Sequence, residues 1–202
     1  SLAVREHYLP SGLHSKVPKN LYSITLSLSD KLDTLVGFFG IDLIPTGSRD
    51  PYALRRYTIA LVRLIVENKI RIKLRSIINY SLTLYKEQGY EFDITKVLKE
   101  LNNFILDRLK NYSKEKGVRS DIIESSILSN DIDELYNGYK KAEVLHRNIG
   151  KEIGRDVVGI YKRTSNILNN EIIKNKLELS NSVDTGLFKN DFEKNLYKKI
   201  QD

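Results

Sequence analysis

Apolar residues recur at three- and four-residue steps along most of this 202-residue chain, and this spacing constrains the fold more than any other feature. Sustained alternation of apolar and polar residues, which is typical of strands, is scarce. In the N-terminal part, one helix face is formed by Leu21, Ile24, Leu28, Leu32, Leu35 and Phe39. The pattern predicts an all-α protein in which amphipathic helices bury their apolar faces against one another.

Start and stop signals divide the pattern into separate helices. Asp50 and Pro51 predict one helix start, because an aspartate caps free N–H groups and a proline in the first turn loses no hydrogen bond. Gly89 predicts a helix end, whereas Asp93 and Gly117 bracket a long helix. After the first long helix, we expect helices at residues 50–66, 74–88, 93–116, 121–128, 131–147, 151–170 and 190–200.

The composition excludes several functions. The chain has no cysteine, so it has no disulfide, thiolate nucleophile or thiolate metal site. His7, His14 and His146 are far apart and lack the paired spacing of a zinc site, so we expect no metal and no catalytic residue. No run approaches the roughly 18 to 20 apolar residues of a membrane span, and a signal-peptide pattern is absent. We therefore expect a cytoplasmic protein without membrane contact.

Positive charge is concentrated in one window of the sequence. The formal net charge is +7, and residues 49–75 hold eight cations against Asp50 and Glu67, which accounts for nearly the whole excess. Such a cluster favours an anionic partner such as nucleic acid. The eight cations are Arg49, Arg55, Arg56, Arg63, Lys69, Arg71, Lys73 and Arg75.

The connection IPTGSRDPYALRR combines a turn, a helix start and three arginines. Arginine suits phosphate because its planar guanidinium donates two parallel hydrogen bonds, whereas the alternative is a surface arginine with a structural partner, which we favour for Arg55. Thr46, Gly47 and Ser48 resemble a phosphate-binding turn, but no Gly-Lys-Ser/Thr follows. Asp50 and Pro51 are assigned to the helix start. The candidate RNA-binding residues of this window are Arg49, Arg55, Arg56 and Arg63.

Asp30 and Asp33 lie three residues apart, on similar sides of the first long helix. This spacing allows a divalent ion or an acid–base pair. Carboxylates on a polar helix face more often form ion pairs, so we expect both to be structural. The expected partners are Arg49, Arg55 or Lys31.

Lys162 and Arg163 follow Tyr161 in the sequence YKRTSNIL. A cation beside an aromatic ring can hold RNA by charge and by base stacking. Alternatively, Tyr161 belongs to the core with Ile160 and Ile167, which share its helix. Lys162 and Arg163 complete the set of candidate RNA-binding residues.

Three segments carry a resemblance to a known family. They are VREHYLPSG, LSDKLDTLVGFFGIDLIPTGSRDPYALRR and YKRTSNIL, in that order. Together they look like the β subunit of bacterial heterotetrameric glycyl-tRNA synthetase. The resemblance covers the whole chain but only the C-terminal part of that subunit, so we expect the sequence to be a piece of a longer protein.

The resemblance implies a fold and a function. Residues 1–90 are similar to the C-terminal part of an HD-like helical domain, and residues 91–202 to a helical connector that leads to an anticodon-binding domain. In the family, the α subunit holds the class II catalytic core and uses ATP with Mg. The resemblance therefore implies a chain without a cofactor of its own, which helps to bind tRNA(Gly) within a glycine–tRNA ligase.

Two other functions belong to different classes. An interaction module would dock the α subunit through exposed helix faces without touching RNA. A phosphohydrolase of the HD type would need a histidine, a His-Asp pair and a later aspartate as metal ligands. Only Asp30 resembles any of these ligands, namely the last, and this departure argues against hydrolysis.

Overall fold

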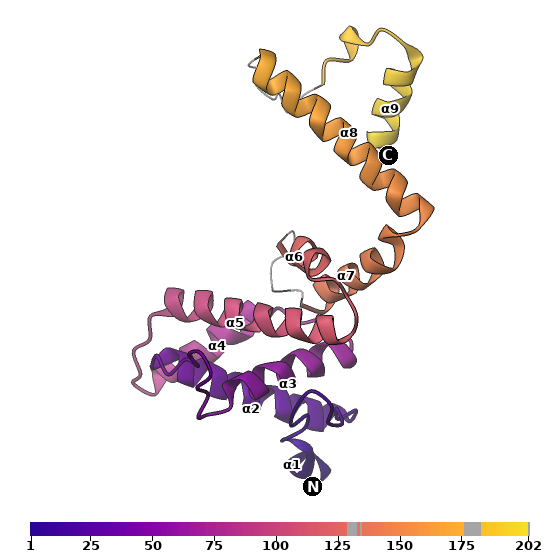
Figure 1. Ribbon diagram of the computed structural model, residues 1–202. Coiled ribbons are helices and arrows are strands. Elements are labelled where there is room, and N and C mark those ends of the chain that lie inside the picture. The colour runs from indigo at the N-terminus through magenta and orange to yellow at the C-terminus, as the bar shows by residue number, and fades with distance from the viewer. Residues whose placement is uncertain (129–132, 134, 176–182, 202) are drawn as a thin grey trace. The chain divides into compact units, whose positions relative to one another are not determined.

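The structure is a computed structural model that describes residues 1–128, 133, 135–175 and 183–201. Within these residues the chain forms helices and no strand, which confirms the predicted all-α class (Figure 1). None of the described helices is long and apolar enough to cross a membrane. The helices are α1 (Leu2–Glu6), α2 (Leu21–Gly40), α3 (Leu54–Glu67), α4 (Leu74–Glu87), α5 (Ile94–Glu115), α6 (Ser120–Leu128), α7 (Leu135–Ile149), α8 (Glu152–Asn175), η2 (Thr185–Leu187) and α9 (Asp191–Gln201).

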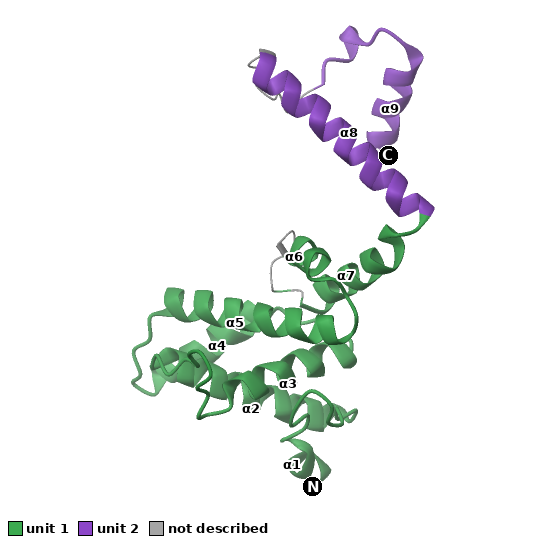
Figure 2. Ribbon diagram, in the orientation of Figure 1, with its two compact units in different colours: residues 1–151 green, residues 152–202 purple. Residues whose placement is uncertain are grey.

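The chain divides into two compact units, residues 1–151 and residues 152–202 (Figure 2). Unit 1 contains α1 to α7, and unit 2 contains α8, η2 and α9. We expected an internal boundary near residue 90, but α5 packs against α2, α3 and α4, so unit 1 continues past that position. The assignment of residues 1–90 to an HD-like domain and of residues 91–202 to a connector stays a prediction.

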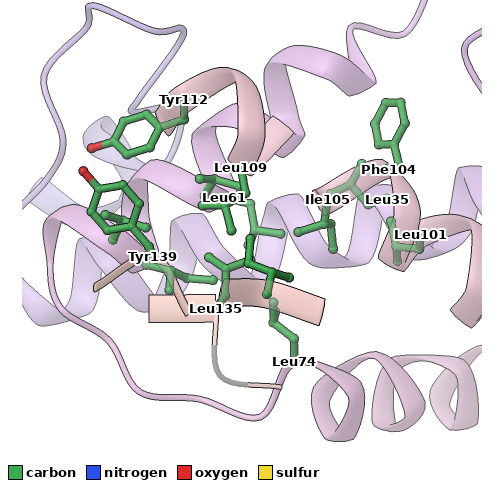
Figure 3. Packing of buried hydrophobic residues seen from close by; sticks show 14 of the residues in the cluster. Leu35, Leu61, Leu74, Leu101, Phe104, Ile105, Leu109, Tyr112, Leu135 and Tyr139 are labelled. Carbon is green, nitrogen blue, oxygen red and sulfur yellow. The ribbon is translucent and has the colours of Figure 1, made fainter. Parts of the chain in front are cut away.

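The core of unit 1 lies between α2, α3 and α5, and residues of α4, α6 and α7 extend it. Leu35, Leu61 and Leu101, one from each of the three central helices, are fully buried (Figure 3). Burying such a side chain contributes roughly 1.5 to 3 kcal/mol. The predicted apolar face of α2 is confirmed at Ile24, Leu32, Leu35 and Phe39, which are buried, whereas Leu21 at the helix start is 72% exposed.

Two glycines end helices where the sequence predicted. Gly89 and Gly117 follow α4 and α5 with φ values of +90° and +80°, which residues with a side chain rarely adopt. At the start of α5, the side chain of Asp93 accepts a hydrogen bond from the N–H of Lys96 at 3.0 Å. These local signals therefore fix both ends of the long helix.

Helix α3 begins later than the sequence predicted. It starts at Leu54, and Pro51 lies in the preceding turn rather than in the helix. Ala53 has a φ of +58°, so the chain bends sharply just before the helix. Because of this bend, the carboxylate of Asp50 still accepts hydrogen bonds from the N–H groups of Leu54 (2.8 Å) and Arg55 (3.0 Å). Asp50 thus satisfies the helix start from a position outside it.

Candidate nucleic-acid interface

One arginine holds the turn that precedes α3. The N–H of Arg49 donates to the carbonyl of Thr46 at 2.9 Å, and Gly47 permits the turn with a φ of +51°. The guanidinium of Arg55 donates to the carbonyls of Gly47 (2.6 Å) and Arg49 (3.3 Å). Arg55 therefore has structural partners, which are carbonyl groups of the turn.

The same turn presents unused donors. Thr46, Gly47, Ser48 and Arg49 are exposed. Among the described residues, the N–H groups of Gly47 and Ser48 find no acceptor. Successive N–H groups in a turn that includes a left-handed residue form a concave site for anions. The turn thus has the donors that a phosphate contact requires.

Arg108, which the sequence did not single out, approaches this region from α5. Its guanidinium lies 4.8 Å from the centre of the Phe104 ring, and its Nε is buried without a hydrogen-bond partner among the described residues. Burial and the positive charge of Arg55 lower the pKa of Arg108, although the carboxylates of Asp107 and Asp50 oppose this shift. Two guanidinium groups repel each other here, and a bound anion would relieve that repulsion.

An exposed aromatic ring lines the same cavity as Arg49. Tyr52 is 46% exposed and stacks on Phe38 with 4.5 Å between the ring centres. It lines a cavity of about 220 Å³ together with Thr46 and Arg49. A ring beside an arginine offers a surface on which an unpaired base can stack. The sequence did not single out Tyr52 either, because a tyrosine at a helix start has no distinctive spacing.

Arg56 faces a neighbouring cavity. Consecutive residues of a helix point about 100° apart, so Arg56 and Arg55 serve different surfaces. Arg56 is exposed and lines a cavity of about 220 Å³ with Asp30 and Tyr57. Within the described part of the chain, no ion pair joins Arg56 to Asp30. Arg56 therefore remains accessible to a phosphate group.

The two predicted structural carboxylates are not joined to their expected partners by ion pairs among the described residues, although the charge of Asp30 acts on its neighbour Lys31. The hydroxyl of Tyr85 donates a hydrogen bond to the backbone carbonyl of Asp33 at 3.2 Å. The described residues contain no group of three or more side chains arranged to hold a metal ion. In the same residues, neither Asp30 nor Asp33 forms an ion pair with Arg49, Arg55 or Lys31.

Arg63 is an interior residue with 6% exposure. Its Nε pairs with Glu67 at 2.8 Å, and its Nη1 donates to the carbonyl of Gly12. The side chain thereby ties the segment before α2 to α3. This burial contradicts the predicted RNA contact at Arg63.

Lys162 and Arg163 lie on α8 in unit 2, and both are exposed. Tyr161 is 71% exposed and Ile160 is 67% exposed, so the alternative in which Tyr161 belongs to the core is not supported by this structure. Each of the three consecutive side chains 161–163 is exposed, and as neighbours on a helix they point about 100° apart. Lys162 and Arg163 remain candidate contacts on unit 2.

These features define an all-α protein with an arginine-rich turn suited to anions. A family model described as the glycyl-tRNA synthetase beta subunit matches residues 1–128. The glycine–tRNA ligase beta subunit of Clostridioides difficile is 33% identical over 201 residues, which cover 100% of this chain and 28% of that protein. A glycine–tRNA ligase beta subunit of Cereibacter sphaeroides is 34% identical over 199 residues, which cover 98% of this chain and 29% of that protein.

The chain belongs to the glycyl-tRNA synthetase beta subunit family. This membership confirms the resemblance found in the sequence. The chain spans less than a third of the length of these relatives. Its expected place in the C-terminal part of the subunit stays a prediction.

Proposed function

We propose that this chain helps to bind and position tRNA(Gly) for glycylation by an α subunit, with the turn before α3 as an RNA contact. The observation that carries the proposal is the exposed turn itself, in which Arg49 accompanies the unused N–H donors of Gly47 and Ser48, while Arg56 is exposed on a neighbouring surface. Such donors and cations favour an anionic ligand, and RNA supplies phosphate groups. Catalysis and the use of ATP with Mg are assigned to the rest of the synthetase.

Each residue of the turn has a distinct role in this proposal. Arg55 fixes the turn, and the exposed Arg49 contacts the RNA backbone together with Arg56 on the neighbouring surface. Arg108 adds positive charge from α5, and Tyr52 receives a base. Such backbone contacts position RNA without reading its sequence. Lys162 and Arg163 supply a further contact from unit 2.

A binding titration tests the proposal. The 202-residue chain is titrated with a tRNA(Gly) transcript and with a non-cognate tRNA at two salt concentrations. The variant Arg49→Ala/Arg56→Ala removes two exposed charges, and Lys198→Ala/Lys199→Ala on α9 is the control with the same change of net charge. We expect the first variant to bind more weakly than the control and its salt dependence to fall by about one per lost contact. Equal affinities of the two variants would contradict the proposal.

A conservative variant separates geometry from charge. Arg56→Lys retains the positive charge but loses the planar pair of donors. We expect this variant to bind tRNA(Gly) more weakly than the unmodified chain and more tightly than Arg56→Ala. Full affinity in Arg56→Lys would show that charge alone is required.

A second function, docking of the α subunit without RNA contact, has a different observation in its favour. None of the described side chains of unit 2 is buried, and Ile153, Ile173 and Phe192 are 69%, 77% and 86% exposed. Exposed apolar side chains on adjacent helices are typical of protein interfaces. This function predicts association with the α subunit that is insensitive to salt and lost in Ile153→Asp/Phe192→Asp.

A further inference from the structure

The cations of residues 49–75 are divided between the two ends of α3. The helix has 14 residues, which corresponds to a length of about 21 Å. Arg63, between the two ends, is buried. The proposed turn lies at the N-terminal end. The C-terminal end is followed by Lys69, Arg71, Lys73 and Arg75.

Four lysines from four segments surround one open cavity at this C-terminal end. The cavity has a volume of about 360 Å³. Lys19 precedes α2, Lys69 follows α3, Lys116 follows α5, and Lys140 belongs to α7. All four are exposed. We call this feature the lysine cavity.

The two carboxylates of the lysine cavity are already paired with arginines. Glu67 pairs with Arg63 at 2.8 Å, and Glu143 pairs with Arg147 at 2.7 Å. Lys140 also bonds to Glu143, and this hydrogen bond, with the charge of Lys140, lowers the pKa of that carboxyl. Because an arginine balances each carboxylate, the lysines give the cavity a net positive charge.

Two tyrosines also line the lysine cavity. Tyr112 and Tyr139 line it, with 5.7 Å between their ring centres and their hydroxyl groups on the same side (Figure 3). Tyrosine hydroxyls are protonated at neutral pH, and burial raises the pKa of both further. The ammonium group of Lys116 lies 5.5 Å from the Tyr112 ring. The Tyr112 hydroxyl already donates to the carboxylate of Glu67 at 3.4 Å, so the lysines and Tyr139 supply the remaining donors of the cavity.

We propose that the lysine cavity binds backbone phosphates of the same RNA that contacts the turn before α3, an inference that rests on the proposed function. Lysine binds phosphate as a point charge and requires no particular base sequence. Cations at both ends of α3, about 20 Å apart, match a long polyanion better than a small anion. The cavity therefore supplies a second, sequence-independent contact.

Lys69 and Lys116 are the residues to substitute. Lys19 donates to the carbonyl of Glu67 at 3.2 Å and so completes the end of α3, and Lys140 is paired with Glu143. Lys69 and Lys116 are exposed and form no ion pair among the described residues. The variant Lys69→Gln/Lys116→Gln removes both charges and keeps long polar side chains. We expect its helical content and melting temperature to equal those of the unmodified chain.

The test compares three variants in titrations with the tRNA(Gly) transcript over a range of salt. We expect Lys69→Gln/Lys116→Gln to bind several-fold more weakly than Lys198→Ala/Lys199→Ala and to lose about one unit of salt slope per lysine. If its affinity equals that of the control while Arg49→Ala/Arg56→Ala binds weakly, the inference on the lysine cavity is wrong and the proposed contact at the turn is retained. If both variants bind as tightly as the control, neither the cavity nor the turn is an RNA contact.

Protection from acetylation identifies the source of the phosphate. The chain is treated with an amine-acetylating reagent in the presence of the tRNA(Gly) transcript, or of inorganic phosphate at the same phosphate concentration. We expect the transcript to protect Lys69 and Lys116 and inorganic phosphate to leave them reactive. Equal protection by inorganic phosphate would overturn the assignment to an RNA backbone.

Discussion

The ammonium group of Lys31 donates a hydrogen bond to Ser27, one turn earlier in α2, at 2.8 Å inside the protein. It also donates to the carbonyl of His7 at 3.0 Å and thereby joins α2 to the segment after α1. The residue is only 3% exposed. Burial lowers the pKa of Lys31, and the charge of Asp30 partly opposes this shift. A lysine in this position makes stability depend on pH.

We expect Lys31 to contribute more stability as the pH rises from its lowered folded pKa towards 10.5. Below its folded pKa the lysine is charged in both states, and burial of that charge costs free energy. Between the folded pKa and the unfolded value of 10.5, the folded state binds fewer protons, so the free energy of unfolding rises with pH. The free energy of unfolding, measured in urea, should therefore rise with pH for the unmodified chain relative to Lys31→Met. A difference between the two chains that does not change with pH would contradict this prediction.

Gly40→Ala should destabilise unit 1. A Cβ at this position would lie 2.5 Å from the ring of Phe92, so α2 or the ring must shift. Overpacking of this kind costs about 1 to 3 kcal/mol of unfolding free energy. Gly159→Ala on α8 is the control, because its Cβ meets no atom within 4 Å and alanine favours the helix by about 1 kcal/mol. Urea unfolding followed by circular dichroism should show a lower free energy of unfolding for Gly40→Ala and a higher one for Gly159→Ala.

Arg63→Met should lower the free energy of unfolding by about 2 to 4 kcal/mol, because it leaves the carboxylate of Glu67 without its partner. The double variant Arg63→Met/Glu67→Leu should recover part of this loss. A double-mutant cycle measured in urea gives the coupling between the two side chains. Additive effects would show that the pair contributes nothing. At temperatures where both variants are folded, RNA affinity should fall in Arg63→Met, whose unbalanced Glu67 lines the lysine cavity, and recover in the double variant.

Arg108→Met should stabilise the chain and weaken RNA binding. Methionine retains apolar contact with Phe104 but removes the charge that lies near Arg55. We expect the gain in unfolding free energy to be larger at low salt than at high salt, because salt screens the repulsion that is removed. The measurements are urea unfolding at two salt concentrations and a titration with the tRNA(Gly) transcript. Loss of stability together with unchanged RNA affinity would argue for a purely structural arginine.

Local signals predicted helix ends well but did not predict which arginines are exposed. Gly89 and Asp93 act through their own backbone and their nearest neighbours, so the sequence sufficed. Arg56 and Arg63 are seven residues apart and thus share one side of α3. One is exposed, whereas the other is buried and held by the carbonyl of Gly12 and the carboxylate of Glu67. Burial here depends on a contact between distant parts of the chain.

The same reason explains the residues that the sequence did not single out. Arg108 lies more than fifty positions after the turn and comes near Arg55 only because α5 packs against α2 and α3. The start of α3 was misplaced because Ala53 adopts a left-handed conformation that nothing in its type favours. In contrast, the capping chemistry of Asp50 was correct because a carboxylate needs only nearby N–H groups.

The exposed side chains of unit 2 also determine the calorimetric behaviour of the chain. The heat capacity of unfolding rises with the apolar surface that becomes hydrated, at about 12 to 15 cal/mol/K per residue in ordinary domains. None of the described side chains between residues 152 and 201 is buried, so melting these helices hydrates little additional apolar surface. The heat capacity increment should therefore match the 151 residues of unit 1 rather than the whole chain.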